Sequence, residues 1–339
     1  MNGILRNICI SGISTAIPET IEKNIGACAY LGERRCKRQI KLTGVDERRV
    51  SPEGQKISDL CYVAALHLMQ KLAWDPEEIR ALVLLTQTPD FKAPSTAFLL
   101  QKMLHIPTDC IVFDVNLGCS AFNVGLQIVS SLLSQFEGSA RGICLIGDIA
   151  SQTIVPGCPA DEMAGNMLFG SAGSAVAIEK GGEKHSEKSI PFCTFSDGNG
   201  YQTIQKRFNG KTHMDGEGVF NFSTDVVPRA IERFWEANHL ADENIDYYVF
   251  HQAQKMILDS LARTCRIQED KELRSIKSYG NTSGASIPLS LCANQNRFSN
   301  VEEVRVFTCG FGVGLSWSMA YMTLPTEFIL PPIESNAIF

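Results

Sequence analysis

A single cysteine, Cys119, lies between an apolar run and a stretch of small residues, in "DVNLGCSAFNVG" (114–125). The pattern predicts a strand, a sharp turn at Gly118 and a helix over 119–133. A helix N-terminus carries partial positive charge and free N–H groups, and both favour the thiolate form of a cysteine. Cys119 is therefore the candidate nucleophile. A structural cysteine buried at the start of a core helix would fit its position equally well.

Two further side chains could act on a developing negative charge. His251 ends the strand-like run "YYVFHQ" (247–252), and the ends of parallel strands commonly carry functional groups. Asn281 lies in "YGNTSGAS" (279–286), where small residues let its amide approach a ligand closely and donate a hydrogen bond. Taken singly, His251 could instead be a core histidine and Asn281 a turn asparagine.

The glycine-rich segment "CGFGVG" (309–314) is followed by a strand-like stretch, so it does not have the pattern of a dinucleotide-binding loop. We interpret it as a turn whose backbone N–H groups face a substrate oxygen. The order Cys, His, Asn also raises the possibility of a papain-like protease. The sequence around Cys119 lacks the C-G-S-C-W signature of that class, which argues against it.

Composition limits the possible size class and function of the protein. The chain has 339 residues, of which 44% are hydrophobic, and this suits one large or two moderate domains. A net charge of −6 argues against broad nucleic-acid binding. Without a long apolar run or a signal peptide, we expect a cytoplasmic protein with no membrane span. The 12 cysteines have neither C-x-x-C nor zinc-finger spacing, so most should be small buried hydrophobes, with no metal site.

Strand and helix patterns alternate along the chain, which indicates an α/β fold with a mostly parallel sheet. The main predicted strands are 8–18, 81–87, 110–116, 142–148, 173–180 and 247–252, followed by "VRVFTCG" and "LSWSMAYM" near the end of the chain. The main predicted helices are 57–72, 95–104, 119–133, 223–239, 253–265 and 286–298.

The two halves of the chain resemble each other. "MLFGSAGSAVAIE" (167–179) parallels "TCGFGVGLSWSMAY" (308–321), and "NLGCSAFNVGL" (116–126) parallels "NTSGASIPLSL" (281–291). Such duplication predicts a pseudo-twofold core with sites where the halves meet. The polar stretch "GGEKHSEKS" (181–189) is the expected boundary, giving an N-terminal half over 1–182 that carries the cysteine and a C-terminal half over 183–339 that carries the histidine and asparagine.

Taken together, these stretches resemble β-ketoacyl-[acyl carrier protein] synthase III, in the thiolase superfamily, over nearly the whole chain. The motifs that carry the resemblance are "TGVDERRV" (43–50), "DVNLGCSAF" (114–122), "MLFGSAGSAVAI" (167–178), "HMDGEGVFNFS" (213–223), "VFHQAQ" (249–254), "YGNTSGAS" (279–286) and "FGVGLSW" (311–317). The resemblance implies a thiolase-like fold of two duplicated βαβ-rich halves in a layered αβαβα core. It also implies a homodimer that condenses an acyl thioester with a malonyl thioester.

By the same resemblance, Cys119 takes the acyl group, and the N–H groups of Cys119 and Val313 form the oxyanion hole. His251 and Asn281 stabilise the enolate that forms when malonyl loses CO₂. Residues that would support these groups are Gln254, Gly312 and Gly314. The alternative is a relative that uses the cysteine to make an ester or amide without a carbon–carbon bond. A non-catalytic binding relative is a third reading, which the complete Cys/His/Asn set disfavours.

The sequence departs from the family pattern at several positions. Gln254 replaces an asparagine, and Ser171 an aspartate. Arg38 and Met163 stand where a tryptophan and an arginine flank the adenine of coenzyme A, so coenzyme A recognition should be weaker and an acyl carrier protein the preferred donor. The acyl pocket should be closed by Ala93, or by the nearby Phe91, from the partner subunit. The expected substrates are acyl-CoA or acyl carrier protein thioesters, with no permanently bound cofactor. The expected carrier-binding residues are Arg38, Lys206, Arg207, Lys211 and Lys255.

Overall fold

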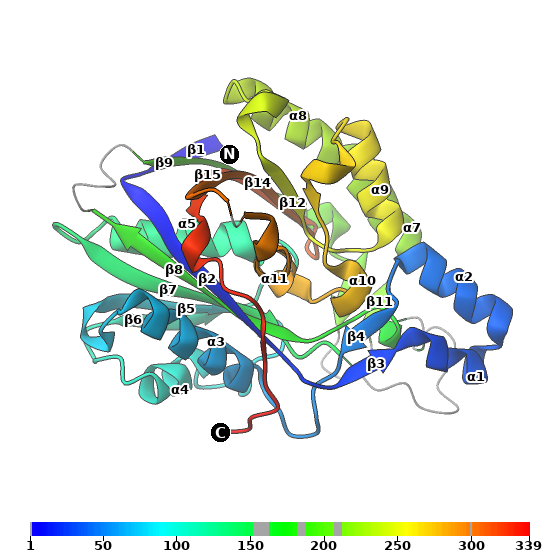
Figure 1. Cartoon of the computed structure of the whole chain (residues 1–339), viewed down its shortest axis with the longest axis horizontal. Coiled ribbons are helices and arrows are strands. Elements are labelled where there is room, and N and C mark those ends of the chain that lie inside the picture. Colours follow the sequence, from blue (N-terminus) through cyan, green and yellow to red (C-terminus); the bar gives the residue numbers. More distant parts are fainter. Residues whose placement is uncertain (1, 152–162, 164, 182–187, 207–211, 299) are drawn as a thin grey trace.

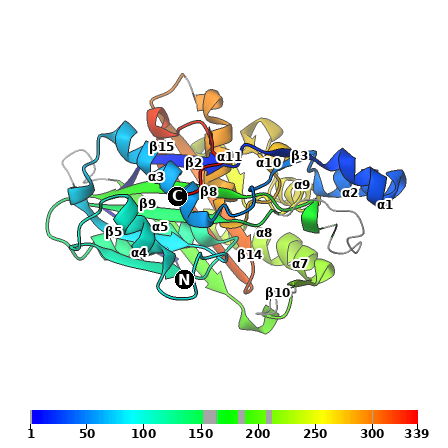
Figure 2. The same cartoon turned by 90° about the horizontal axis from the view of Figure 1, so that it is seen from below.

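The protein has five layers, in which two six-stranded sheets enclose two central helices and carry further helices on their outer faces (Figures 1 and 2). The computed structural model describes residues 2–151, 163, 165–181, 188–206, 212–298 and 300–339. The predicted layered α/β fold with duplicated halves is confirmed.

The first sheet has the order β16-β2-β8-β7-β5-β6. Its strands are β16 (Ile333–Glu334), β2 (Ile8–Ile17), β8 (Ala172–Lys180), β7 (Ala140–Asp148), β5 (Ile79–Leu85) and β6 (Ile111–Val115). The second sheet has the order β1-β9-β15-β14-β12-β13. Its strands are β1 (Asn2–Arg6), β9 (Ser189–Ser196), β15 (Ser316–Pro325), β14 (Glu303–Gly312), β12 (Tyr247–Phe250) and β13 (Glu272–Leu273). From the second position on, the strands β2, β8, β7, β5 and β6 of the first sheet correspond in chain order to β9, β15, β14, β12 and β13 of the second. The two halves of the chain therefore build their sheets in the same way, as the internal duplication predicts.

Both sheets are mixed, so the prediction of a mostly parallel sheet is wrong. Strand β5 runs parallel to β6 and β7, whereas β8 runs antiparallel to both β7 and β2. In the second sheet, only the turn Val313–Leu315 joins β14 to β15. A connection this short permits only an antiparallel pair, because a parallel pair needs a crossover of a dozen or more residues.

The terminal strands cross between the halves. β1 pairs with β9 in the second sheet, and β16 pairs with β2 in the first. The expected boundary between residues 182 and 183 lies outside the described residues, and the division at that point stays a prediction.

Helices α5 (Ala121–Leu133) and α11 (Ser286–Ala293) lie between the sheets (Figure 1). Helix α5 buries Phe122, Leu126 and Val129 in the main hydrophobic core. Gly125 lets this helix approach β7, since a Cβ there would lie 2.5 Å from Cys144 Sγ. Close packing on both sides fixes the position of the residues that precede the helix, including Cys119.

The outer helices bury one apolar side each. Helices α3 (Ile57–Leu72) and α4 (Thr96–Met103) pack on the first sheet, and α8 (Val227–Ala237) and α9 (Lys255–Thr264) pack on the second. Further elements are β3 (Ile21–Lys23), β4 (Glu47–Arg49), β10 (Ile204–Lys206), β11 (Thr212–Met214), α7 (Gly216–Asn221) and α10 (Ile276–Tyr279). None of the helices in the described part of the chain is long and apolar enough to cross a membrane.

Several predicted helices differ in the structure in their bounds or in their helix type. The helix expected over 119–133 begins at Ala121, and that expected over 286–298 gives way to a 3₁₀ turn after Ala293. The helix expected over 223–239 begins with a π-helical turn, Phe222–Val226, before α8. Pro228 lies at the start of α8, where its missing N–H removes no hydrogen bond that the helix needs.

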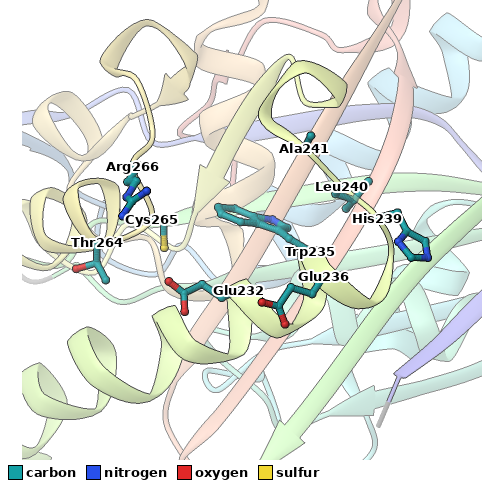
Figure 3. A pocket seen from close by; sticks show the side chains of 9 residues that line it. All are labelled: Glu232, Trp235, Glu236, His239, Leu240, Ala241, Thr264, Cys265 and Arg266. Atoms are coloured by element: carbon teal, nitrogen blue, oxygen red, sulfur yellow. The ribbon is translucent and has the colours of Figure 1, made fainter.

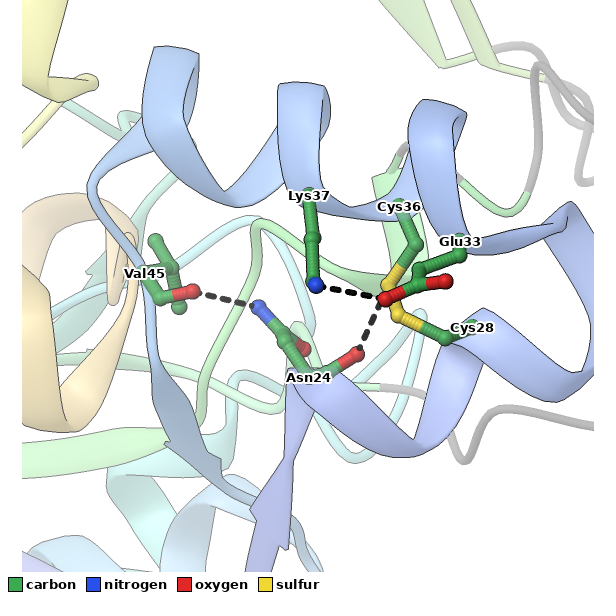
Figure 4. The surroundings of a disulfide bond; sticks show 6 residues. All are labelled: Asn24, Cys28, Glu33, Cys36, Lys37 and Val45. Atoms are coloured by element: carbon green, nitrogen blue, oxygen red, sulfur yellow. Dashed lines mark hydrogen bonds and ion pairs between the residues drawn. A yellow bond between two sulfur atoms is a disulfide. The ribbon is translucent and has the colours of Figure 1, made fainter.

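A helical arm formed by α1 (Cys28–Leu31) and α2 (Glu33–Thr43) extends from the β3–β4 pair (Figure 1). Cys28 and Cys36 form a disulfide in this arm (Figure 4), so the expectation of reduced cysteines is wrong for this pair. Gly32, with a φ of 76°, turns the chain between the two helices and brings the two Cα atoms to 5.0 Å.

Candidate active site

Cys119 lies in the turn just before α5, where strand β14 ends against it. Gly312, the last residue of β14, has a φ of 154° and touches the cysteine so closely that a Cβ there would lie 2.6 Å from Cys119 Sγ. Gly310 is similarly close, since a Cβ at this position would lie 2.7 Å from the carbonyl oxygen of Cys119. The Ser120 hydroxyl, 2.8 Å from Ser316 Oγ, ties the same turn to β15. The two halves of the chain therefore meet at the thiol.

Burial raises the pKa of the Cys119 thiol to about 11, and the nearby Asp148 raises it further. Backbone hydrogen bonds from Val313 and from Cys119 itself oppose this shift. The prediction that a helix N-terminus favours the thiolate is therefore wrong for the free enzyme. The helix begins two residues later, at Ala121, and desolvation of the thiol outweighs the backbone dipoles. The two N–H groups predicted to form the oxyanion hole do face the sulfur.

Substituting Gly312 by alanine should slow acylation of Cys119 by roughly 10²-fold, because the new methyl group would displace the sulfur from the two N–H donors. The rate of mass gain after addition of an acyl thioester measures this step. Gly26→Ala is the matched control, since a Cβ at Gly26 meets no atom within 4 Å. Acylation of the Gly312 variant at the wild-type rate would refute the close approach described above.

His251 follows β12, and its ring is buried, with 2% of the residue exposed. Its Nδ1 lies 2.8 Å from Ser286 Oγ, and its ring meets the edge of Phe311, with 5.7 Å between the ring centroids. Burial lowers the pKa of His251 to about 4, although a backbone hydrogen bond with Ser283 opposes the shift. The imidazole is consequently neutral at physiological pH.

Hydrogen bonds fix both the backbone and the side chain of Asn281. Its N–H donates to the Leu168 carbonyl at 2.9 Å, and its carbonyl accepts from Gly170 at 3.0 Å. Its amide nitrogen donates to the Ala253 carbonyl at 3.3 Å, and its amide oxygen accepts from Ser283 N at 2.9 Å. Asn281 is thereby linked to the residues that follow His251.

Arg48, from the early "TGVDERRV" stretch, supports the segment that pairs with Asn281. Its guanidinium is fully buried and donates to the Phe169 carbonyl at 2.9 Å and to Glu22 at 3.0 Å. Phe169 forms a β-bridge with Asn281. The role of the early stretch is therefore to hold the asparagine segment in place.

The segment from Asn281 to Ser286 packs directly on the cysteine turn. A Cβ at Gly284 would lie 3.0 Å from both the Gly118 carbonyl oxygen and Ala121 Cβ. Phe311, which contacts the His251 ring, precedes Gly312, which contacts Cys119. Through these contacts the structure brings the predicted cysteine, histidine, asparagine and Val313 backbone to one place.

Asp148 is part of this neighbourhood, and the sequence interpretation missed it. It ends β7 with only 2% of the residue exposed, and burial raises the pKa of its carboxyl group. Its Oδ1 accepts from Thr86 Oγ1 at 3.0 Å, Gln87 N at 2.6 Å and Thr88 Oγ1 at 3.2 Å. The signal was available, because Asp148 ends the apolar run "GICLIGD" as His251 ends "YYVF".

Other predicted residues lie further from the thiol. Ala93 and Phe91 are exposed in the loop between β5 and α4, with Lys56 Nζ 5.5 Å from the Phe91 ring. Gln254 is the N-cap residue of α9 and is partly buried. Gly314, with a φ of 136°, forms the turn after Val313. Their predicted roles stay predictions.

Two of the proposed carrier-binding residues lie on helices that contact each other, α2 and α9. Arg38 is exposed on α2, and Lys255, at the start of α9, is exposed and forms an ion pair with Asp259. Met163 is buried against Cys36 and Met167. Lys206 ends β10, whereas Arg207 and Lys211 lie outside the described residues.

A surface cavity of about 770 Å³ lies between α8 and α9 (Figure 3). Its lining contains none of the predicted site residues and consists of Glu232, Trp235, Glu236, His239, Leu240, Ala241, Thr264, Cys265 and Arg266. No group of three or more His, Cys, Asp or Glu side chains that could hold a metal occurs in the part of the chain that the structure describes.

Comparison with solved structures defines the class as thiolase-like. A 3-oxoacyl-(acyl-carrier protein) synthase from Burkholderia xenovorans LB400 superimposes with a TM-score of 0.91 at 28% identity, covering 99% of each chain. The 3-oxoacyl-(acyl carrier protein) synthase III of Pseudomonas aeruginosa PAO1 gives a TM-score of 0.83 at 25% identity, over 94% of this chain and 99% of that one. The fold is thus that of the thiolase-like acyltransferases.

Sequence comparison gives the family. Residues 113–198 match the profile described as 3-oxoacyl-[acyl-carrier-protein (ACP)] synthase III, and residues 235–324 match its C-terminal profile. The β-ketoacyl-[acyl-carrier-protein] synthase III of Lactococcus lactis subsp. cremoris (strain MG1363) is 32% identical over 83% of this chain and 89% of its own length. The Rhodopirellula baltica relative of the same name is 28% identical over 94% and 99%. The chain belongs to the β-ketoacyl-[acyl carrier protein] synthase III family. The predicted Claisen-condensing acyltransferase is confirmed over the ester- or amide-forming alternative.

Proposed function

We propose that Cys119 carries the acyl group and that His251 and Asn281 serve the condensation that follows. The observation that carries the proposal is the meeting of β14 with the cysteine turn, where Gly312 touches the thiol and the Val313 N–H faces it. The asparagine segment packs on the same turn, where Gly284 contacts Gly118 and Ala121. An acyl group on the sulfur would therefore lie beside the N–H donors and near the segments that carry the histidine and asparagine.

In the first half-reaction, Cys119 Sγ attacks the carbonyl carbon of an acyl thioester. The N–H groups of Cys119 and Val313 stabilise the oxyanion that forms. The bond to the carrier sulfur breaks, and the thiol proton of Cys119 leaves with the departing carrier thiol. Because the thiol pKa is raised to about 11, this proton stays on the sulfur until the substrate is bound.

In the second half-reaction, a malonyl thioester loses CO₂, and the electron pair of the broken bond becomes an enolate. The neutral His251 ring and the Asn281 amide each donate a hydrogen bond to the enolate oxygen. No strong base is required, because decarboxylation itself supplies the carbanion. The carbanion attacks the acyl carbon on Cys119, the β-ketoacyl product leaves on its carrier, and the released thiolate takes a proton from solvent.

We further propose a cytoplasmic homodimer without a permanently bound cofactor, in which Ala93 or Phe91 of one subunit closes the acyl pocket of the other. Acyl carrier protein is the proposed donor. Supporting this, helix α2 exposes several basic side chains in a chain of net charge −6, and acidic partners are attracted to such a surface. These side chains are Arg34, Arg35, Lys37, Arg38 and Lys41.

The test compares kcat/KM for formation of the β-ketoacyl product from the same acyl group on the carrier protein and on coenzyme A. Activity with the carrier protein should be higher and should fall with ionic strength, since charges are screened over roughly 10 Å at 0.1 M. The double variant Lys41→Glu, Lys255→Glu should lower carrier-protein activity about tenfold and leave coenzyme A activity nearly intact.

A matched control is Lys102→Glu, which reverses an exposed charge on α4, on the other side of the molecule. Lys206→Glu, Arg207→Glu and Lys211→Glu extend the same test to the other proposed residues. Higher activity with coenzyme A, or no effect of the reversals, contradicts the carrier proposal. Acylation without any β-ketoacyl product contradicts the proposed condensation.

A further inference from the structure

A carboxamide side chain lies against the cysteine turn on the side of the first sheet. A Cβ at Gly118 would lie 2.4 Å from Gln87 Oε1 and 2.9 Å from Gln87 Cδ. The end of the glutamine thus fills the space beside Gly118 that a side chain would otherwise take. Gly118 directly precedes Cys119, so the amide lies next to the residue that carries the acyl group.

The backbone of Gln87 is fixed from several directions. Asp148 Oδ1 accepts from its N–H at 2.6 Å and also binds the hydroxyl groups of Thr86 and Thr88. Thr88 Oγ1 in turn accepts from Ile149 N at 2.9 Å. The buried carboxyl group therefore ties the end of β5 to the end of β7 and sets the direction in which the Gln87 side chain leaves the backbone.

The Gln87 amide has free hydrogen-bonding capacity. Within the described residues, its side-chain oxygen and nitrogen have no hydrogen-bond partner, although the residue is partly buried. An apolar acyl chain that covered this amide would remove it from water without giving it a partner, which is unfavourable. An oxygen atom on the acyl group could accept from the amide NH₂ or donate to its oxygen.

We propose that Gln87 is a specificity-determining residue that selects acyl groups with an oxygen substituent close to the thioester, such as hydroxyacyl groups. The inference rests on the proposed acylation of Cys119 and goes beyond it, because it names the chemical class of the acyl group. Gln87 forms one wall of the acyl site beside Gly118, and the substituent of the acyl chain binds its amide.

The experiment is a competition between acyl thioesters of equal chain length on the same carrier: butyryl, 2-hydroxybutyryl and 3-hydroxybutyryl. Intact mass and peptide mapping give the rate at which each group appears on Cys119. In the wild-type protein, at least one hydroxyacyl group should load about tenfold faster than butyryl, the effect of one well-formed hydrogen bond. Gln87→Met, which has a similar shape but no amide, should abolish or reverse this preference.

Gln70→Met, at an exposed position on α3, is the matched control and should keep the wild-type preference. Faster loading of butyryl by the wild-type protein would overturn the proposal without any variant. An unchanged ratio of rates in Gln87→Met would overturn it too. Absence of every acyl group from Cys119 would instead refute the proposed acyl-enzyme, so the two failures can be told apart.

Discussion

Replacing Cys119 by alanine should abolish transfer of the acyl group to the protein and reduce product formation by at least about 10³-fold, as expected when a nucleophile is removed. The reason is geometric. Gly312 closely approaches this sulfur, and backbone hydrogen bonds from Val313 and from Cys119 itself oppose the rise in its pKa that burial causes. The direct measurement is intact-protein mass after incubation with an acyl thioester, followed by peptide mapping.

Cys110→Ala is the control, because Cys110 and Cys119 are the two free cysteines that the structure describes as not fully buried. Burial raises the pKa of Cys110 to about 12, and only one backbone hydrogen bond, from Leu82, opposes this shift, whereas two oppose it at Cys119. Brief treatment with a limiting alkylating agent should therefore label Cys119 first. An acyl group found on Cys110, or persisting in Cys119→Ala, would show that the nucleophile has been misassigned.

The sequence could predict which residues lie at strand ends and turns, but not the environment they meet there. Cys119 and His251 were found because each follows an apolar run at the edge of a predicted sheet. The raised pKa of Cys119 depends on β14 and the asparagine segment, which come from the other half of the chain. Burial by distant segments leaves no local pattern, so the expected thiolate was wrong.

The absence of a local pattern also explains the other differences between the sequence predictions and the structure. Asp148 was missed because a charged residue at the end of a strand more often faces solvent, whereas here Thr86, Gln87 and Thr88 donate hydrogen bonds to its Oδ1 inside the protein. The disulfide in the helical arm depends on the turn at Gly32 rather than on any cysteine spacing motif. The strand order, by contrast, follows from the duplication that the sequence revealed, since similar halves form similar sheets.

His251→Ala and Asn281→Ala should each slow decarboxylation of the malonyl thioester by about 10²–10³-fold, while acylation of Cys119 changes by less than about threefold. Their proposed hydrogen bonds form only when the enolate charge develops, whereas the oxyanion donors of acylation are backbone groups of Cys119 and Val313. The two rates are measured separately, as CO₂ release and as mass gain on Cys119. His239→Ala, an exposed histidine after α8, is the control and should leave both rates unchanged.

The pH profile distinguishes a hydrogen-bond donor from a base. Burial lowers the pKa of His251 to about 4, so the ring should be neutral throughout pH 6–8 and the rate of decarboxylation should be flat over this range. A histidine with an ordinary pKa near 6.5 would instead titrate there. A fall in rate centred near pH 6.5 that disappears in His251→Ala would contradict the buried, neutral ring. Equal loss of acylation and decarboxylation in His251→Ala would indicate that the histidine deprotonates Cys119, and the proposed division of labour between the two half-reactions would be wrong.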